Sequence, residues 1–501
     1  MFIKTLHISN LKCFNNKIIA DIAIPNGHKG SGLNILIGEN GNGKTTFLEA
    51  INYLTLNSYS VDNKLTINDF NDYKNEIKII AEIDDFKCNS TIDFYNKNDW
   101  YFLADGIEFS AASRKKKERN KLLSSAFESH SYYKIKGKYL DKTGAVKKDV
   151  DSRDKTFNNN YISGEGLNVF YFDKNRNRQI STGNFKTTFE RILEDLNWKF
   201  IKSLNPDKES ELIKNIAGEY FKSIDKITKS NAGAKTASDL KEFFGNEDYE
   251  NLKIDLLNLL VPYGNAFFSI RKDDELKQIS IKDLGSGVEI ILTLLLLKNI
   301  AGASKGKIVY LIDEPELHLH PKAQEKLLEL LLEESKDKQI FISTHSPYMF
   351  KGTFGVGANL LLFKRNSAKE IEILNARSEG WGLFGSASPT WGEINWFAYG
   401  LATVEFHNEL YGFLQAKAID EDDRYSFEAK FDEWIATKGI EQNCEWTKEN
   451  RNKSITPQRR TVQTFIRNSI HHPENNHNRK YTDEELNTSI EQMIRLLQDD
   501  L

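Results

Sequence analysis

The sequence predicts an α/β fold in which a mixed sheet is covered by helices, with a helical insertion and an all-α C-terminal domain. Strands and helices alternate over residues 266–375, which implies parallel strands covered on both faces. A short apolar strand, LNILIG, ends on a glycine-rich turn and is followed by an amphipathic helix. Beyond residue 380 the chain reads as helical to its end.

The composition is that of an ordinary globular protein of two or three domains. The chain has 501 residues, 39% of them hydrophobic, and a formal net charge of -4, so any basic surface must be local. Its three cysteines show no C-x-x-C spacing, which argues against a disulfide framework or a zinc site. The longest apolar run, 288–297, is about half a membrane span. We therefore expect a cytoplasmic protein without membrane contact.

The chain divides by composition into four segments. We expect a first α/β lobe at 1–185 with a polar, lysine-rich insertion at 106–165, a helical segment at 186–262, a second α/β lobe at 263–378 and a helical C-terminal domain at 379–501. The Gly- and Trp-rich stretch 381–396 resembles a linker, and Trp396–Gln415 has the spacing of one amphipathic helix.

The strongest motif is GENGNGKT, Gly38–Thr45, which matches G-x-x-x-x-G-K-[ST] between a strand and a helix. In that context backbone N–H groups and the helix N-terminus bind phosphate oxygens. We expect Lys44 to reach the β- and γ-phosphates and Thr45 to bind Mg²⁺. The sequence therefore predicts an ATP site made by Gly38, Asn40, Gly41, Asn42, Gly43, Lys44, Thr45 and Thr46.

Two further buried strands end on polar side chains. KIVYLIDEP delivers Asp313, which would hold Mg²⁺ through water, and Glu314, which would act as general base on the attacking water. QIFISTHSP ends at His345, which would contact the γ-phosphate. The carboxyl ends of such strands form the usual ligand edge of an open sheet.

These three elements, in this order, resemble the ABC ATPase superfamily. The opening Phe2–Phe14, the string IDEPELHLHP and STHSP are similar to the soluble SMC-, RecF- and OLD-like branch, including ATPase domains of the AAA_15 and AAA_21 types. The resemblance covers about residues 1–375. It implies that two copies meet head to tail, with two ATP molecules held between them.

The resemblance also implies a signature motif, and DLGSGVE stands where it is expected. Ser286 and Gly287 would cap the γ-phosphate of ATP bound to the partner. Gly285 and Val288 depart from the family pattern, which predicts slow hydrolysis. Gln179 is the candidate for the Mg²⁺-sensing glutamine.

The C-terminal segment TPQRRTVQTFIRNSIHHPENNHN resembles the HEPN motif, read as Arg467-x4-His472. HEPN domains are helical bundles, and many are metal-independent ribonucleases. A histidine can move a proton at the ribose or the leaving oxygen, and an arginine can stabilise phosphate charge. The alternative is a helical domain for oligomerisation or partner docking, with Arg467 and His472 at a polar helix end.

The combination resembles bacterial antiviral ATPases. In the PrrC-like interpretation, an ATP-driven dimer holds a dormant ribonuclease that acts on tRNA or other RNA. In the PtuA-like alternative of Septu or retron systems, the chain has no nuclease of its own and regulates an HNH partner. A RecF-like DNA-repair ATPase is the second alternative. The lysine run Ser113–Lys121 would either contact nucleic acid or form a solvated loop.

Overall fold

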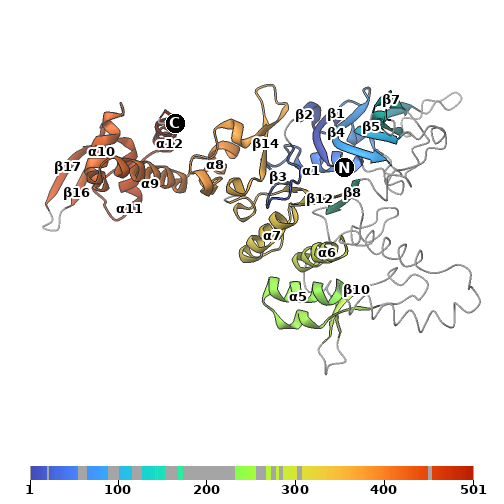
Figure 1. Ribbon diagram of the computed structural model, residues 1–501. Coiled ribbons are helices and arrows are strands. Elements are labelled where there is room, and N and C mark those ends of the chain that lie inside the picture. The colour runs from blue at the N-terminus through green and yellow to red at the C-terminus, as the bar shows by residue number, and fades with distance from the viewer. Residues whose placement is uncertain are drawn as a thin grey trace, which may run out of the picture. The chain divides into compact units, whose positions relative to one another are not determined.

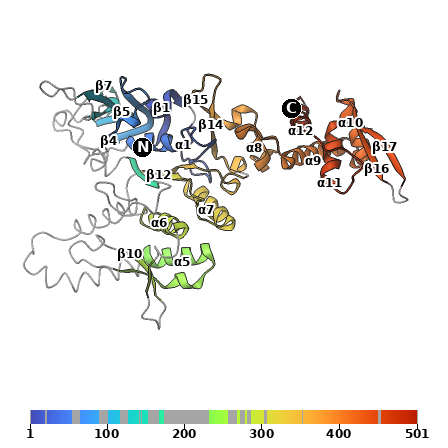
Figure 2. The same ribbon diagram turned by 180° about the vertical axis from the view of Figure 1, so that it is seen from behind.

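The structure is a computed structural model, and it divides the chain into two compact units (Figures 1 and 2). It describes residues 2–19, 22–54, 65–88, 101–115, 127–140, 143, 145–152, 167–172, 232–255, 267–271, 278–280, 286–301, 307–351, 353–449 and 454–499. The first unit comprises Met1–Met349 and Gly357–Asn375, and the second comprises Phe350–Val356 and Ala376–Leu501.

A six-stranded mixed sheet carries the nucleotide motifs of the first unit. Its order is β15-β14-β3-β13-β12-β8, and all strands except β15 run parallel to their neighbours. The strands are β3 (Leu33–Gly38), β8 (Leu167–Phe172), β12 (Lys307–Asp313), β13 (Gln339–Ser343), β14 (Asn359–Arg365) and β15 (Ile371–Asn375). Because β3, β13 and β12 are adjacent, their carboxyl ends meet at one edge. The predicted α/β fold with a mixed sheet is confirmed.

A second sheet is antiparallel, in the order β2-β1-β4-β5-β6-β7. It is built from β1 (Ile3–Leu11), β2 (Phe14–Ile19), β4 (Ile77–Cys88), β5 (Tyr101–Lys115), β6 (Phe127–Leu140) and β7 (Val146–Ser152). Helix α1 (Lys44–Tyr53) packs between the two sheets, since Phe47, Leu48 and Ile51 share one apolar core with residues of both.

The other α-helices in the described part of the first unit lie on the other side of β12 from β1 and β4, as both views show (Figures 1 and 2). They are α5 (Ala232–Phe244), α6 (Ser286–Ala301) and α7 (Pro321–Glu334). Pro321 starts α7, where a missing N–H costs nothing, and Leu327, Leu328 and Leu331 are its buried face. In the described part of the chain, no helix is long and apolar enough to cross a membrane.

Two segments of the first unit contain strands that the sequence did not predict. The segment 106–165, expected as a polar insertion, forms in its described part most of β5 together with β6 and β7, which extend the antiparallel sheet to its edge. Ile107, Phe109 and Ala111 alternate into the core just before the lysine run begins, which is the pattern of a strand. Within 186–262, α5 is helical as expected, but β9 (Leu252–Asp255) is a strand that pairs with β10 (Phe267–Arg271), which also pairs with β11 (Gln278–Ser280).

The second unit is helical around one apolar core, as predicted, with an added hairpin. Its helices are α8 (Trp391–Tyr399), α9 (Val404–Glu421), α10 (Glu428–Thr437), α11 (Val462–His471) and α12 (Asp483–Asp499). Phe406, Leu410, Phe431, Phe465 and Met493 are fully or almost fully buried where these helices meet.

Three details of this unit differ from the sequence analysis. Strands β16 (Cys444–Glu449) and β17 (Ile455–Arg460) form an antiparallel hairpin, so the unit is not all helical. The expected helix Trp396–Gln415 is two helices, because Gly400 ends α8 at φ +64° and Thr403 caps α9. The expected linker 381–396 holds the start of α8, whose capping box joins Thr390 and Glu393.

Candidate nucleotide site

The phosphate loop joins β3 to α1 and depends on two glycines. Gly38 has φ +144°, and a Cβ there would lie 2.3 Å from the carbonyl oxygen of Phe363. Gly43 has φ +88°, and a Cβ there would lie 2.9 Å from Cys13 Sγ. Both positions therefore require glycine. The buried Lys44 ammonium donates to the carbonyl oxygens of Gly38 at 2.7 Å and Glu39 at 3.0 Å, which keeps it within the loop.

Two of the three predicted magnesium ligands, Thr45 and Asp313, lie together. Thr45 Oγ1 donates to Asp313 Oδ2 at 2.9 Å, although the two residues are far apart in the sequence. Ser343, at the end of β13, donates through its hydroxyl to Asp313 Oδ1. Asp313 and Ser343 are both fully buried. A hydroxyl and a carboxylate are hard oxygen donors of the type that Mg²⁺ takes beside nucleotide phosphates, so the side chains present fit that ion.

Glu314 is held in an unusual backbone conformation, with φ +48°. Its N–H donates to Ser343 Oγ at 3.0 Å and to the Ser343 carbonyl at 3.1 Å. A non-glycine residue at positive φ costs free energy and persists where neighbours fix it. The same serine hydroxyl thus contacts both the expected magnesium ligand and the expected general base.

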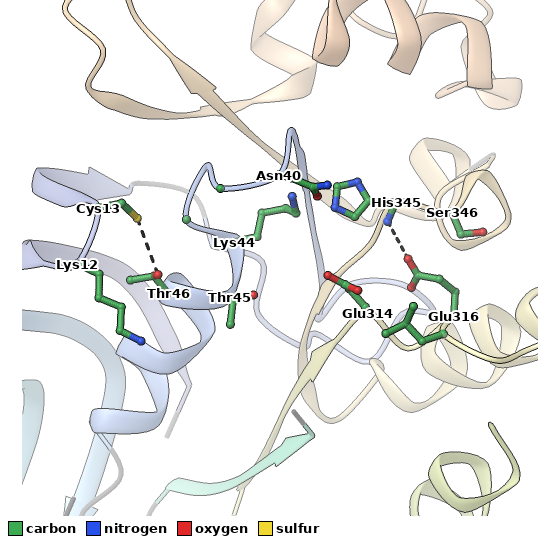
Figure 3. Close-up of a pocket in the computed structure, with 13 residues that line it drawn as sticks. Lys12, Cys13, Asn40, Lys44, Thr45, Thr46, Glu314, Glu316, His345 and Ser346 are labelled. Atoms are coloured by element: carbon green, nitrogen blue, oxygen red, sulfur yellow. Dashed lines mark hydrogen bonds between the residues drawn. The ribbon is translucent and has the colours of Figure 1, made fainter. Parts of the chain in front are cut away.

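His345 lies two residues beyond the end of β13, and its backbone N–H is bound by Glu316. The His345 N–H donates to Glu316 Oε1 at 2.8 Å. Burial raises the pKa of the Glu316 carboxyl, and this hydrogen bond partly opposes the rise. His345, Glu314 and Glu316 line the same pocket (Figure 3).

The pocket has a volume of about 790 Å³, which is the size of a small-molecule site. Figure 3 shows the phosphate loop on one side and Glu314, Glu316 and His345 on the other. Its lining includes these expected residues: Asn40, Gly41, Gly43, Lys44, Thr45, Thr46, Glu314 and His345. Gly38 and Asn42 belong to the same loop, and the Asn42 amide donates to the Phe363 carbonyl at 3.2 Å.

Other lining residues were missed by the sequence analysis. They are Lys12, Cys13, Glu316, Leu317 and Ser346. Glu316 and Ser346 stand one or two residues from motif positions, so the motifs themselves carried the signal. Lys12 and Cys13 form the turn between β1 and β2 and could be found only from the fold, which brings the Cys13 thiol to 3.8 Å from Thr46 Oγ1.

The signature residues are described only in part. Ser286 begins α6, and Gly287 is buried in its first turn. A Cβ on Gly287 would lie 2.8 Å from the His318 carbonyl oxygen and 2.8 Å from a methyl group of Leu319. The start of α6 therefore packs against the turn that follows Glu314. Gln179 and Gly285 lie outside the described residues.

The predicted C-terminal pair lies at α11. Arg467 Nη1 donates to Glu428 Oε2 at 2.7 Å, and the Asn468 amide donates to the other oxygen of the same carboxylate at 2.9 Å. His472 ends the helix with its side chain 53% exposed, and its Nδ1 lies 3.3 Å from a carboxylate oxygen of Glu474. Both side chains thus have acidic neighbours within the second unit.

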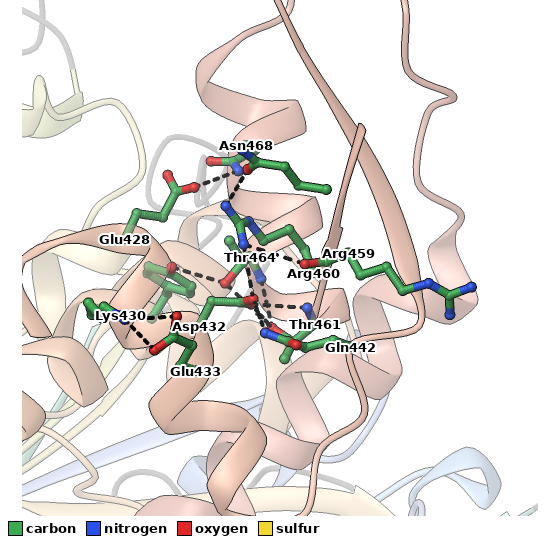
Figure 4. Close-up of polar contacts among 12 residues, drawn as sticks. Glu428, Lys430, Asp432, Glu433, Gln442, Arg459, Arg460, Thr461, Thr464 and Asn468 are labelled. Atoms are coloured by element: carbon green, nitrogen blue, oxygen red, sulfur yellow. Dashed lines mark hydrogen bonds and ion pairs between the residues drawn. The ribbon is translucent and has the colours of Figure 1, made fainter. Parts of the chain in front are cut away.

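A second acidic side chain, the buried carboxylate of Asp432, collects the polar contacts at the start of α11 (Figure 4). Asp432 is fully buried and accepts from the Thr461 N–H at 3.0 Å, the Thr461 hydroxyl at 2.7 Å and the Gln442 amide at 2.7 Å. Arg460 lies 3.8 Å from it, whereas Arg459 points away from the cluster. Asp432 therefore joins α10 to the hairpin and to the start of α11.

The chain is similar to one family model and to several solved structures. The family model for the AAA ATPase domain, AAA_15, matches residues 1–350. No curated protein sequence matches the chain. Solved SMC head structures match at low identity.

One is an SmcHead bound to the C-winged helix domain of ScpA, with 14% identity over 76% of this chain and 99% of that chain, at a TM-score of 0.44. A second is an Smc head with an extended coiled coil bound to the C-terminal domain of ScpA from Pyrococcus furiosus, with 14% identity over 75% and 97% of the two chains and a TM-score of 0.42. The SMC head domain from Thermotoga maritima has 13% identity over 75% and 99% and a TM-score of 0.33. On the family match, which spans most of its length, the chain belongs to the AAA ATPase domain family.

Proposed function

We propose that the chain binds ATP with Mg²⁺ in the pocket beside α1 and hydrolyses it there. The observation that carries this proposal is the 2.9 Å contact between Thr45 and Asp313, at the edge where the phosphate loop, Glu314 and His345 also meet. Within an ATPase family, this is the arrangement that phosphoryl transfer requires, because catalysis is mainly positioning and charge stabilisation.

Each side chain has a role in this proposal. Loop N–H groups and Lys44 bind the phosphates, and Thr45 and Asp313 hold Mg²⁺, which neutralises charge on the phosphate oxygens. Glu314 aligns the attacking water and accepts a proton from it. His345 donates a hydrogen bond toward the γ-phosphate.

The proposed use of ATP is association of two copies. In the ABC-type interpretation, Ser286 and Gly287 of one protomer close the nucleotide site of the other. What supports this is the position of both residues at the N-terminus of α6, a 16-residue helix whose dipole and first-turn N–H groups favour an anionic phosphate. The departures from the family signature favour slow turnover and hence a switch.

For the second unit we propose that this switch controls a nuclease in bacterial antiviral defence. The HEPN-like interpretation assigns RNA cleavage, on tRNA or other RNA, to Arg467 and His472. The exposure of His472 at the end of α11 supports access to a substrate.

One observation favours the alternative, a unit that docks and regulates a partner nuclease. The Arg467 guanidinium is paired with Glu428, and Asn468 is bound to the same carboxylate, so this end of α11 has a structural use. Under that alternative the chain itself would not cleave RNA.

Two variants test the ATPase. Lys44→Ala should abolish nucleotide binding, and Glu314→Gln should bind ATP, turn over slowly and accumulate as a nucleotide-bound dimer in light scattering. A Glu314→Gln protein that hydrolyses ATP at the wild-type rate would remove Glu314 as the base.

The nuclease proposal is tested separately with the Arg467→Ala/His472→Ala double variant. Expression of the wild-type chain should cause growth arrest with cleaved RNA, and the double variant should not. Cleavage that persists in the double variant refutes the HEPN assignment. Cleavage that needs a co-expressed partner supports the docking alternative.

A further inference from the structure

Two side chains outside the expected catalytic set join the loop of His345 to the turn after Glu314. The first is Glu316, whose Oε1 accepts from the His345 N–H at 2.8 Å. Its other oxygen, Oε2, is buried and makes no close hydrogen bond among the described residues, although the Thr344 side chain is near enough to lower the pKa of the carboxyl against the effect of burial. A buried carboxylate with few hydrogen-bond partners costs free energy. Its retention beside the nucleotide pocket therefore suggests a functional role.

The second side chain is Gln324, in the first turns of α7. Its amide nitrogen donates to the carbonyl oxygens of Leu319 at 2.8 Å and Glu316 at 3.4 Å. Its amide oxygen accepts from the hydroxyl of Ser346, the residue directly after His345. One amide therefore connects the turn 316–319 with the loop 345–346. We refer to Glu316 and Gln324 as the clasp.

The same turn is the surface on which the start of α6 rests. Gly287 packs so closely against His318 and Leu319 that a Cβ would lie 2.8 Å from atoms of either residue. His318 has φ +66°, a backbone conformation that costs a non-glycine residue free energy and that the contacts of the turn must hold in place. Movement of the turn is thus coupled sterically to Gly287.

We propose that Glu316 and Gln324 are positioning residues of the ATPase, which hold the His345–Ser346 loop on the 316–319 turn and transmit occupancy beside His345 to the helix of Gly287. This inference rests on the proposed ATPase function and adds a cis connection to it. Within one protomer, the site that its own ATP fills is linked to the surface offered to the partner's ATP. The link consists of packed groups with hydrogen bonds, which is the kind of contact that carries coupling between sites.

The clasp is tested with full-length variants in ATP binding and turnover. Glu316→Ala removes the acceptor of the His345 N–H, and loss of a buried hydrogen bond corresponds to a drop in kcat of about 10- to 100-fold. The ATP Kd should stay within about threefold, since neither residue is a phosphate ligand in this proposal. Glu316→Gln keeps an acceptor of the same shape and should turn over about tenfold faster than Glu316→Ala.

Gln324→Ala should lower kcat to a similar extent and also reduce the ATP-dependent dimer of the Glu314→Gln background. Ser346→Ala removes the hydroxyl that donates to the Gln324 amide oxygen. It should therefore lower kcat and the dimer to the same extent as Gln324→Ala. The matched control is Glu325→Ala, an exposed position on the same helix, which should leave kcat, Kd and dimer unchanged.

Wild-type turnover in Glu316→Ala, or equal turnover in the Gln and Ala variants at position 316, would overturn the clasp. So would a parallel loss of ATP binding and melting temperature, which marks a purely structural role. These outcomes differ from a failure of the proposed function, which would appear as Lys44→Ala retaining full ATP binding.

Discussion

Replacement of Ser343 by alanine is the sharpest test of how the site is assembled. The hydroxyl of Ser343 donates to Asp313 and accepts from the Glu314 N–H at 3.0 Å, so one oxygen positions the magnesium ligand and the base. The residue is fully buried, and alanine fits its space without a clash. The variant therefore removes two hydrogen bonds and little else.

The size of the effect follows from the two bonds. The bond to the Asp313 carboxylate is charge-assisted, and such bonds contribute about 1.5–3 kcal/mol. In the variant, the Glu314 N–H keeps its hydrogen bond to the carbonyl of residue 343 at 3.1 Å, so losing the bond to the hydroxyl costs less free energy. A total near 2 kcal/mol corresponds to a roughly 30-fold fall in turnover. The Mg²⁺ concentration for half-maximal activity should rise in parallel.

Phosphate release at saturating ATP, measured across a series of Mg²⁺ concentrations, gives both quantities. Ser335→Ala is the matched control: Ser335 is equally buried and donates to the Leu332 carbonyl at 2.7 Å, but it is not part of the pocket lining. That control should lower stability and leave the Mg²⁺ dependence unchanged. If Ser343→Ala matches the wild type at every Mg²⁺ concentration, our account of how Asp313 and Glu314 are held is wrong.

Three further changes probe the loop and the second unit. Gly43→Ala should weaken nucleotide binding more than Gly41→Ala, because both have positive φ but only Gly43 has a neighbour, Cys13 Sγ, within 3 Å of a new Cβ; equal Kd values for a fluorescent nucleotide would contradict this. Asp432→Ala leaves buried donors without their carboxylate and should cost about 3–5 kcal/mol of unfolding free energy. Denaturation followed by tryptophan fluorescence reports on it, since five of the seven tryptophans lie beyond residue 376: Trp381, Trp391, Trp396, Trp434 and Trp446. A loss below about 1 kcal/mol would refute the central role of Asp432. Burial lowers the pKa of His407 to about 4, below the ordinary value of 6.5, so the unfolded chain takes up a proton first as the pH falls. Between pH 7 and pH 5 the wild type should therefore lose about 2 kcal/mol more stability than His407→Gln, and identical pH profiles would exclude that buried state.

The central sheet could be predicted from the sequence because its strands are continuous apolar runs that end on chemically distinctive residues. LNILIG and KIVYLID are buried on both faces, and each is followed directly by the polar residues that form the pocket. Such runs determine their own secondary structure and their place in the middle of the sheet.

The errors have the opposite cause. Strand β7 is rich in charged residues, and β17 contains Pro457, so their pairing depends on neighbours that composition does not reveal. Gly400 ends α8 because its backbone is left-handed, and the spacing of apolar residues does not reveal such a break. The contacts of Glu316 and Gln324 join segments about 20 to 30 residues apart, and a motif does not show which residues of another segment its own residues will contact.

The division of the chain into units has a consequence for how the protein can be taken apart. The segment Phe350–Val356 belongs to the second unit, yet it starts five residues after His345 and is followed by a return of the chain to the first unit. Phe350 stacks on Trp391, and the Phe354 N–H donates to the Ser388 carbonyl at 3.2 Å. A fragment that ends at residue 375 would keep this segment but lose its partners Trp391 and Ser388. Phe350 and Phe354 would then lack the contacts that cover them. Along the sequence, the two units therefore alternate. Replacing the second unit by a foreign domain would require more than one cut in the chain.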